Sequence, residues 1–249
     1  NRSPKTAPGF LKFYEMGSKI KTNSRLLYQY KNAAIIRHII KPPKKQKHHM
    51  KTVKIWNDQP SDKQIEQIAS RIKDGEIWIL PTDSIYGIMC DALNQKAIKR
   101  VCELKGINPE KHDLSIVCES ISMASDYARI GNRTFALLRD NTPGPFTFLC
   151  KAQPVLPKEF KARKTVGIRI PDCTTTRSVA AYLGHPLLTT SIKFESDDYA
   201  VNAELIAEAY EGKADGIAIG EPGRITPTAV IDCTDDDPVV IREGAQSLK

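Results

Sequence analysis

The spacing of apolar residues after position 50 alternates between a helical and an extended pattern. Ser61 and Gln64 have the spacing of a helical capping box, and an apolar stripe at helical intervals follows them. We therefore predict a helix that begins after Ser61 and is closed by Gly75. Asn94 is positioned to cap a second helix, whose apolar stripe ends at Leu104. Further helices are predicted over 121–128, 132–140, 174–183 and 202–211.

Short apolar or alternating runs between these helices have the length and composition of β-strands. They cover residues 76–80, 114–118, 146–151, 165–170, 186–191, 216–220, 228–232 and 238–243. Strands and helices intermix along the chain, and no internal repeat is visible. This pattern predicts a single α/β domain over residues 50–249, built around a twisted, mixed β-sheet flanked by helices.

The net charge of +8 is unevenly distributed along the 249 residues. Residues 1–49 hold nine lysines and three arginines against one acid, Glu15, which gives +11. Residues 50–249 hold 25 basic and 28 acidic residues, which gives −3. The basic character therefore belongs to residues 1–49, the leader. Nucleic-acid binding by residues 50–249, the body, would require a local basic patch.

Three interpretations of the basic leader, residues 1–49, are open. It is a disordered arm that contacts RNA, an organellar targeting peptide, or a consequence of a start site placed too early, with Met50 as the initiator. We favour the last, because the pattern of a folded domain begins directly after Met50. No apolar run approaches the roughly 18 residues of a membrane span. We expect the protein to be cytoplasmic.

Six scattered cysteines lack the spacing of a zinc site or a CxxC pair. They are Cys90, Cys102, Cys118, Cys150, Cys173 and Cys233. Most lie within or beside apolar segments, so we expect buried, reduced thiols rather than disulfides or metal ligands. No metal site is predicted.

Polar side chains cluster where the predicted strands end. The segment PTDSIYG, residues 81–87, follows the strand 76–80 directly, and strand ends are where α/β proteins bind ligands. Other strands end in Arg169 or in the Thr189–Ser191 hydroxyls. Phosphate-binding loops, G-x-S-x-G and HExxH are absent from the sequence. Hydroxyls, lysines and arginines without a nucleophile–base pair favour a site that binds anions, although a structural role is favoured for each residue taken singly.

Five segments in order resemble the motifs of the threonylcarbamoyl-AMP synthase family, the YrdC/YciO fold family. They are LPTDSIYGI (80–88), NTPGPFTFLCKA (141–152), KTVGIRIPD (164–172), GHPLLTTS (184–191) and ITPTAVIDCTDDDPVVIREG (225–244). Any one of them is a weak signal, but five in order over nearly the whole body are specific. The leader lies outside the resemblance.

The resemblance implies a YrdC-like fold with a large, open, basic cavity. It implies a nucleotidyltransferase that condenses L-threonine, bicarbonate and ATP, with Mg²⁺ on the nucleotide, to threonylcarbamoyl-AMP and pyrophosphate, in the threonylcarbamoyladenosine modification of tRNA. No catalytic nucleophile is expected. The residues that match the threonine side are Thr82, Tyr86 (as a pocket wall), His112, Arg169, Thr189 and Thr228. Those that match the ATP side are Lys105, Thr165, Ser191 and Arg242.

Two departures from the synthase motifs point to the YciO-like branch of the family. The synthases carry K-x-R and S-x-N, whereas Ile107 replaces the arginine here and Lys193 replaces the asparagine. Loss of a charged phosphate donor costs about 1.5–3 kcal/mol per hydrogen bond. The alternative hypothesis is therefore a YciO-like protein that binds tRNA or double-stranded RNA through phosphates, with weak or different nucleotide chemistry.

Overall fold

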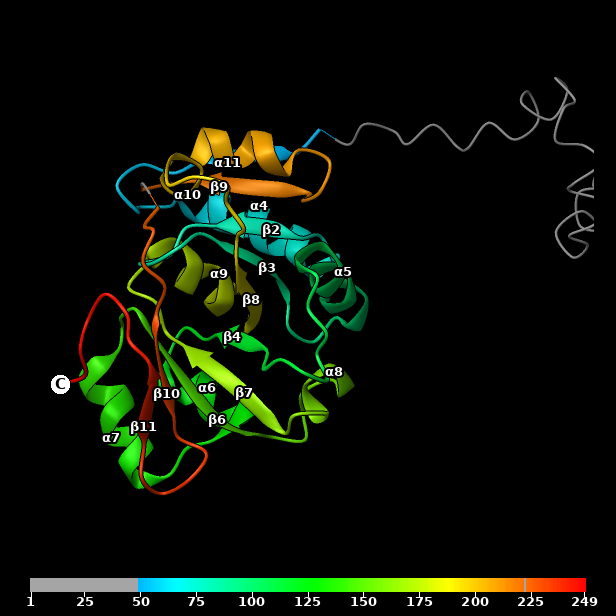
Figure 1. Cartoon of the computed structure of the whole chain (residues 1–249). Coiled ribbons are helices and arrows are strands. Elements are labelled where there is room, and N and C mark those ends of the chain that lie inside the picture. The colour runs from blue at the N-terminus through cyan, green and yellow to red at the C-terminus, as the bar shows by residue number, and fades with distance from the viewer. Residues whose placement is uncertain (1–48, 222) are drawn as a thin grey trace, which may run out of the picture. The chain divides into compact units, whose positions relative to one another are not determined.

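A computed structural model of the chain describes residues 49–221 and 223–249 (Figure 1). The interpretations of the basic leader lie outside these residues, apart from His49. Within the described part of the chain, no helix combines the length and the apolar character that a membrane crossing needs.

The strands of the sheet are short, between two and seven residues. Their bounds are β1 (Lys51–Lys54), β2 (Trp78–Leu80), β3 (Gly87–Asp91), β4 (Ser115–Val117), β5 (Ala128–Arg129), β6 (Phe146–Ala152), β7 (Thr165–Arg169), β8 (Leu187–Ser191), β9 (Gly216–Ile219), β10 (Ala229–Asp232) and β11 (Val239–Arg242). The helices are α4 (Asp62–Lys73), α5 (Gln95–Lys105), α6 (Ile121–Tyr127), α7 (Asn132–Asn141), α8 (Lys158–Lys161), α9 (Thr174–Leu183), α10 (Asp198–Val201) and α11 (Ala203–Tyr210).

One mixed sheet runs through the domain in the order β1-β9-β2-β3-β8-β4-β7-β6-β10-β11, with β5 paired to β6. The sheet combines parallel pairs, such as β4 with β7, and antiparallel pairs, such as β3 with β8. The predicted fold class, a single α/β domain with a mixed sheet and flanking helices, is confirmed.

Most predicted elements are present, with bounds within about two residues. The capping box at Ser61 is formed, and Asn94 accepts hydrogen bonds from the first turn of α5. All six cysteines are free and buried, as expected. The sequence patterns missed β1, β3, β5, α8 and α10. Strand β3 begins at Gly87 and is buried on both faces, so it shows neither the alternation nor the length that a half-buried strand would.

The first turn of α9 depends on a residue far away in the sequence. Its N-cap residue, Cys173, makes no side-chain capping bond. Asp58, from the loop after β1, instead accepts hydrogen bonds from the backbone N–H groups of Thr174 and Thr175 and from the Thr175 hydroxyl, the last at 2.6 Å. This remote cap fixes the end of α9 that faces the end of β2.

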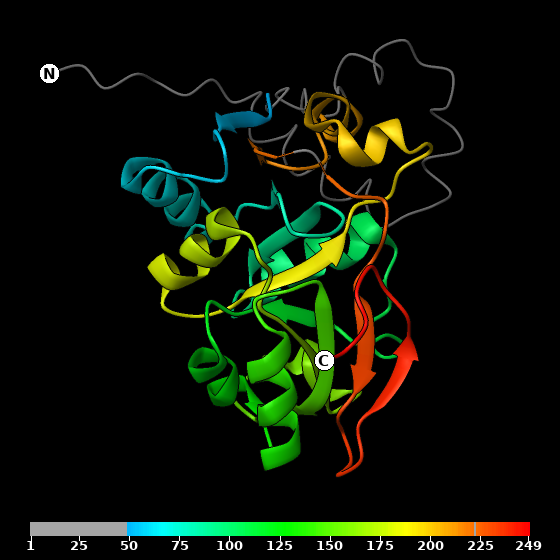
Figure 2. The ribbon, with the colours of Figure 1, turned by 90° about the vertical axis from the view of Figure 1, so that its left-hand side faces the viewer.

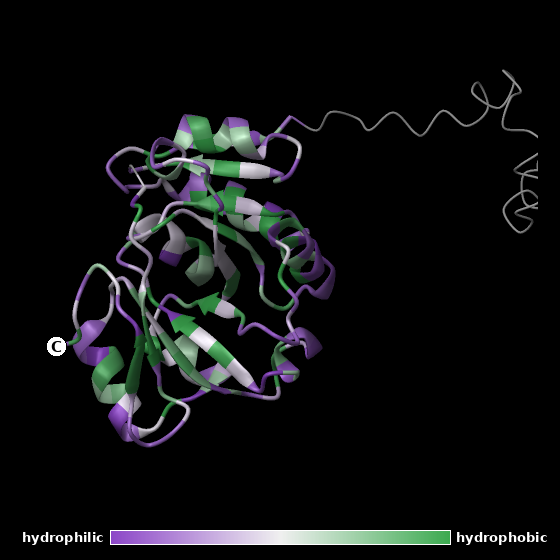
Figure 3. Ribbon diagram, viewed as in Figure 1, coloured by the Kyte–Doolittle hydropathy of each residue, from purple (hydrophilic) through white to green (hydrophobic). Residues whose placement is uncertain are grey.

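The two faces of the sheet differ in what covers them. Alternate residues such as Ile88, Phe148 and Ile168 join an apolar cluster with side chains of α5, α6, α7, α8 and α11. The other face packs against α4 and α9 through Trp78 and Leu187, among others. Figure 2 shows α4 and α9 side by side on that flank, and Figure 3 shows the alternation of apolar and polar positions along β7.

Candidate functional site

The sheet face that carries α4 and α9 continues into a row of hydroxyl side chains and glycines. Thr189 on β8 pairs with Ser115 on β4, and Ser115 pairs with Gly167 on β7. Side chains two residues apart on a strand share a face, so Ser191 and Thr165 belong to the same row. A Cβ on Gly167 would overlap the Ser115 hydroxyl and would lie 3.0 Å from Thr147 Cγ2. The hydroxyl face is defined here as Ser115, Thr147, Thr165, Thr189 and Ser191.

An open cleft of about 580 Å³ lies at the end of β2. Thr82 and Asp83 line it, together with the Pro143–Pro145 turn and the exposed Arg224. Its other lining residues are Asp58, Pro81, Asp172, Cys173, Glu221, Gly223, Ala245 and Gln246. Among the side chains expected to bind substrates, Thr82 contributes directly to this cleft. The predicted basic character of the cavity stays a prediction.

Thr82 is the centre of a compact turn rather than a freely exposed hydroxyl. Its Oγ1 accepts a hydrogen bond from the Ser84 N–H at 3.0 Å and donates to the Ile85 carbonyl at 2.9 Å. The Ser84 hydroxyl lies 3.1 Å from Thr82 Oγ1 and accepts from Arg169 Nη2 at 2.9 Å. The PTDSIYG segment thus connects the cleft to the guanidinium of Arg169.

Arg169 and Asp83 form a buried ion pair, with Arg169 Nη2 3.4 Å from Asp83 Oδ1. Only 5% of the Arg169 side chain and 8% of the Asp83 side chain are exposed. Burial raises the pKa of the Asp83 carboxyl above its ordinary value, although Arg169 opposes the shift. Burial also lowers the pKa of the guanidinium, against the effect of Asp83. The cost of desolvation therefore exceeds the attraction within the pair.

Two buried polar atoms on β7 and β8 lack a hydrogen-bond partner among the described residues. They are Arg169 Nε and Thr189 Oγ1. Buried polar groups are nearly always paired, and an unpaired one costs about 1–3 kcal/mol. Donors and a hydroxyl left unpaired on a polar sheet face are what a site for a small carboxylate- and hydroxyl-bearing molecule requires.

Thr228, just before β10, and Arg242, on β11, lie together at one edge of the sheet. Arg242 donates to the Thr228 carbonyl from Nε at 3.1 Å and from Nη2 at 2.8 Å. The Thr228 hydroxyl lies 2.8 Å from the Thr147 hydroxyl, which belongs to the hydroxyl face. Arg242 also contributes to lowering the pKa of Arg169, which places the two cations near each other.

Lys105 and Ser191, both expected on the ATP side, are in contact. Lys105 Nζ donates to the Ser191 carbonyl. Burial and, to a smaller extent, the neighbouring Lys193 lower the pKa of Lys105 to about 8. A Cβ built on Gly106 would lie 3.8 Å from Lys193 Nζ, so the second ammonium lies beside the end of α5. Two ammonium groups this close favour an anionic partner.

Ile107, which replaces the arginine of the synthase motif, has a structural role. Gly106 ends α5 in the left-handed conformation at φ 71°, and the Ile107 N–H donates to the Cys102 carbonyl at 2.8 Å. This is the Schellman arrangement, in which the residue after the glycine makes an apolar contact with the last turn. Ile107 packs against the apolar cluster accordingly.

Tyr86, His112 and Thr165 also match substrate-side residues of the family, and their roles stay predictions. Tyr86 is fully buried, and its hydroxyl donates to the Glu221 carbonyl at 2.9 Å and accepts from the Gly220 N–H. Tyr86 does not line the cleft described above, and its expected place in a pocket wall stays a prediction. His112 is exposed, and its Nδ1 lies 3.1 Å from the Asn108 carbonyl. The Thr165 hydroxyl belongs to the hydroxyl face but donates to Asp113.

Several residues of the site carried no separate sequence signal. Asp83 and Ser84 lie inside the PTDSIYG segment, and their position after a strand could have identified them. Thr147 lies on a strand whose alternation was recognised, so its face could have been assigned as well. Arg224, whose backbone N–H donates to the Ser84 carbonyl at 3.1 Å, follows no recognisable pattern.

The fold and this site define a mixed-sheet α/β protein with a row of hydroxyl side chains on one face of its sheet. A family model described as Telomere recombination, the Sua5/YciO/YrdC domain, matches residues 70–244. The chain therefore belongs to the Sua5/YciO/YrdC family.

Relatives on both branches of this family are similar to the chain. The uncharacterized protein YciO of Escherichia coli K12 is 33% identical over 198 residues, which cover 78% of this chain and 96% of YciO. Its crystal structure matches with a TM-score of 0.74, over 80% of this chain and 97% of that one. The threonylcarbamoyl-AMP synthase of Bacillus subtilis is 29% identical over 74% of this chain and 54% of the synthase.

A solved structure with a small molecule is also similar. The crystal structure of P. abyssi Sua5 complexed with L-threonine matches with a TM-score of 0.71 and 26% identity. The match covers 78% of this chain and 57% of that one. The chain thus spans a little over half the length of these two synthase-branch relatives and nearly all of YciO.

Proposed function

We propose that this protein is an L-threonylcarbamoyladenylate synthase-like enzyme acting in the threonylcarbamoyladenosine modification of tRNA. Its reaction would combine L-threonine, bicarbonate and ATP to threonylcarbamoyl-AMP and pyrophosphate. The observation that carries the proposal is a set of two buried, unpartnered polar atoms, Arg169 Nε on β7 and Thr189 Oγ1 on the hydroxyl face. Membership of a family that contains threonylcarbamoyl-AMP synthases supports it.

The threonine side of the proposed site is the arrangement around Arg169. The guanidinium would donate to the threonine carboxylate, while Asp83 and Ser84 hold its other edge in place. Thr189 would hydrogen-bond the threonine hydroxyl or amine. A site of this kind selects ligands that carry both a carboxylate and a hydroxyl. An analogue that lacks either group would leave Arg169 or Thr189 buried and unpaired.

The chemistry needs positioning more than a protein nucleophile. The threonine amine takes up bicarbonate to form a carbamate and water. A carbamate oxygen then attacks the α-phosphorus of ATP, the bond to the bridging oxygen breaks, and pyrophosphate leaves. Lys105 and Lys193 would stabilise the negative charge of the phosphates. Magnesium would enter with its substrate as Mg·ATP. Among residues 49–221 and 223–249, no group of three His, Cys, Asp or Glu side chains has the geometry to hold a metal.

The proposal is tested by pyrophosphate release from the full chain with ATP, bicarbonate and magnesium, with and without L-threonine. We expect threonine-dependent release that Arg169→Ala abolishes. Arg139→Ala is the matched control, because Arg139 is an exposed arginine of α7 whose side chain pairs with Asp140. Absence of threonine-dependent release from folded protein would refute the proposal.

RNA binding is the second candidate function, and one observation favours it. Ile107 packs against the apolar cluster where the synthase motif has arginine, while Lys193 places a second ammonium near Lys105. This change loses a forked phosphate donor and keeps a point charge, which suits phosphates of a nucleic acid as well as those of ATP. Affinity for double-stranded RNA should fall steeply with added salt, whereas threonine affinity should not.

A further inference from the structure

A second pocket lies on the other side of the Lys105–Ile107 turn. It has a volume of about 370 Å³ and is formed by the C-terminal half of α5, the turn 106–109 and α8. Helices α5 and α8 are in contact there, and Figure 1 shows α8 below the end of α5. Its lining residues are Lys99, Cys102, Glu103, Gly106, Ile107, Asn108, Pro109 and Glu159. We call it the α5–α8 pocket.

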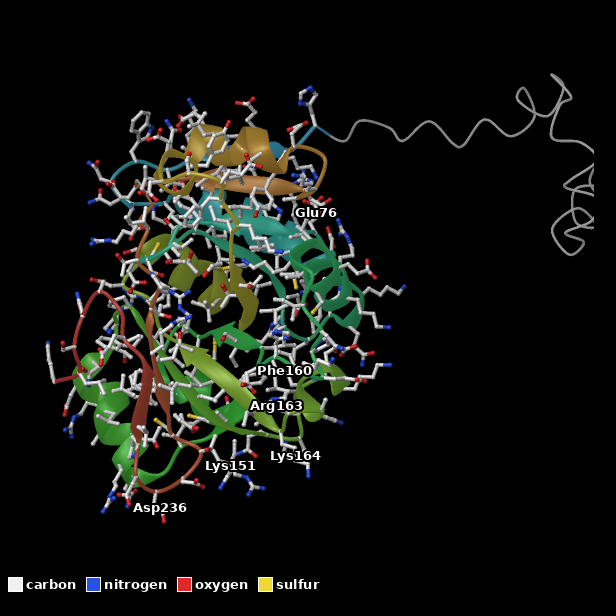
Figure 4. The ribbon with its side chains drawn as sticks, viewed as in Figure 1. Glu76, Lys151, Phe160, Arg163, Lys164 and Asp236 are labelled. Atoms are coloured by element: carbon white, nitrogen blue, oxygen red, sulfur yellow. The ribbon has the colours of Figure 1, made fainter. Side chains whose placement is uncertain are left out.

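Glu159 is the unusual member of the α5–α8 pocket. Only 8% of this residue is exposed, and neither carboxylate oxygen has a hydrogen-bond partner among residues 49–221 and 223–249. Its neighbour Phe160, which Figure 4 labels on α8, is buried in the apolar cluster and fixes this short helix. A buried carboxylate without a partner is costly, so a compensating cation is the simplest completion of this site.

The surroundings of Glu159 determine what kind of cation would fit. Burial raises the pKa of the Cys102 thiol, and Glu159 raises it further. The Glu159 carboxylate therefore lies near Cys102, on the α5 side of the pocket. Ile107 and Pro109 supply apolar surface. The described residues there lack the three-ligand group that a metal ion needs. An apolar wall around a single buried carboxylate suits an organic cation with an aliphatic stem.

We propose that the α5–α8 pocket binds a small aliphatic primary amine in its ammonium form. The ammonium donates hydrogen bonds to the Glu159 carboxylate, and the aliphatic stem lies against Ile107, Pro109 and Cys102. This site is separate from the hydroxyl face, because Ile107 and Phe160 of α8 pack in the apolar cluster on the other side of the sheet. Ligand binding there would contact the same turn that carries Lys105.

Lys99 is the internal group that could replace such a ligand. It is an exposed residue of α5 that also lines the pocket, and no ion pair joins it to Glu159 in the described structure. Its charge and that of Glu103 cancel, so the pocket carries one net negative charge from Glu159. Replacement of Lys99 therefore distinguishes two possibilities: a pocket that binds an external amine, and an ion pair between Lys99 and Glu159.

The test uses n-butylammonium chloride as the probe and n-butanol as its neutral counterpart, with the full chain at pH 7. We expect saturable NMR shifts of the Cys102, Gly106 and Ile107 amides with butylammonium and much weaker ones with butanol. Glu159→Gln should weaken butylammonium binding roughly ten- to hundredfold, because it removes a charge-assisted hydrogen bond. Lys99→Met should keep or strengthen binding.

Stability without ligand provides a second, independent readout. Glu159→Gln removes an uncompensated buried charge, so its thermal midpoint should equal or exceed that of the wild type, whereas butylammonium should raise the midpoint of the wild type alone. The proposal is overturned if Glu159→Gln binds the amine as tightly as wild type, or if neither protein binds it. It is also overturned if Lys99→Met lowers the midpoint and abolishes the effect of Glu159→Gln, since Lys99 would then be the partner.

Discussion

Arg169 and Asp83 lie 3.4 Å apart in the interior of the domain, and burial shifts the pKa of each against the ion pair that they form. Such a pair positions side chains more than it stabilises the fold. Asp83 Oδ2 also accepts from the Asp172 N–H at 2.8 Å, which ties the end of β2 to the start of α9. The pair thus orients the guanidinium at the site.

Replacement of Asp83 by asparagine tests this interpretation. The folded-state pKa of Asp83 is raised, so the folded chain retains a proton that the unfolded chain releases. The contribution of Asp83 to stability is therefore greatest below the unfolded pKa and is lost as pH rises through the folded pKa. In urea unfolding at pH 7, Asp83→Asn should not lower the free energy of unfolding. Between pH 3 and pH 7, the variant should lack the decrease in this free energy that Asp83 causes in the wild type. A loss above about 1 kcal/mol at pH 7, the typical cost of a mutation, would contradict the account.

Asp58 should show the opposite pH dependence. Burial raises its pKa, but the hydrogen bonds from Thr175, Thr174 and Cys173 outweigh burial and leave the pKa below its ordinary value. Stability from Asp58 is thus present above the unfolded pKa and lost as pH falls through the folded pKa. Asp58→Ala should cost about 0.5–2 kcal/mol at pH 7 in urea unfolding, as loss of a helix cap does. The loss should shrink in acid, and a loss that grew in acid would exclude this role.

Lys193→Asn restores the residue of the synthase motif and removes one of two neighbouring cations. The pKa of Lys105, about 8, should rise, but not to its ordinary value, because burial is the larger cause of its shift. Since the folded pKa is low, the contribution of Lys105 to stability grows as pH rises from about 8 toward 10.5. An NMR titration of the Lys105 side chain measures the change. Lys73→Asn, at the end of α4, serves as control, and an equal shift in both variants would refute the contact.

Gly167→Ala tests the hydroxyl face without removing any hydrogen-bonding group. The added Cβ would overlap the Ser115 hydroxyl and crowd Thr147, which holds Thr228. Displacement of these hydroxyls should weaken L-threonine binding about 10- to 100-fold in a calorimetric titration. Gly131→Ala is the control, because a Cβ there meets no atom within 4 Å. Unchanged affinity in Gly167→Ala would mean that the substrate does not lie on this face.

The sequence allowed the fold to be predicted where a signal is local. Caps such as Ser61 and Asn94 define helix starts, and the alternation at the start of β6 identifies a strand. Strand β3 escaped because burial on both faces removes that alternation. The cap of α9 by Asp58 escaped because it joins segments more than a hundred residues apart.

The site could be predicted in its residue types and only partly in its geometry. Arg169, Thr189 and Thr228 were expected from strand ends and motifs, and the structure buries all three. Tyr86 was expected as a wall, but nothing in the sequence shows that its ring is covered and its hydroxyl bonded to the Gly220–Glu221 backbone. The role of Ile107 in ending α5 likewise depends on a contact that a motif comparison does not show.

The most direct test of the central claim compares L-threonine binding by Thr189→Val and Thr190→Val in calorimetric titrations of the full chain. These neighbours on β8 point to opposite faces of the sheet, and the Thr189 hydroxyl alone lies on the hydroxyl face as a buried, unpartnered group. The account predicts saturable binding to wild type and Thr190→Val, and binding at least tenfold weaker to Thr189→Val. Equal affinity in the two variants, or no binding by folded wild type, would contradict it.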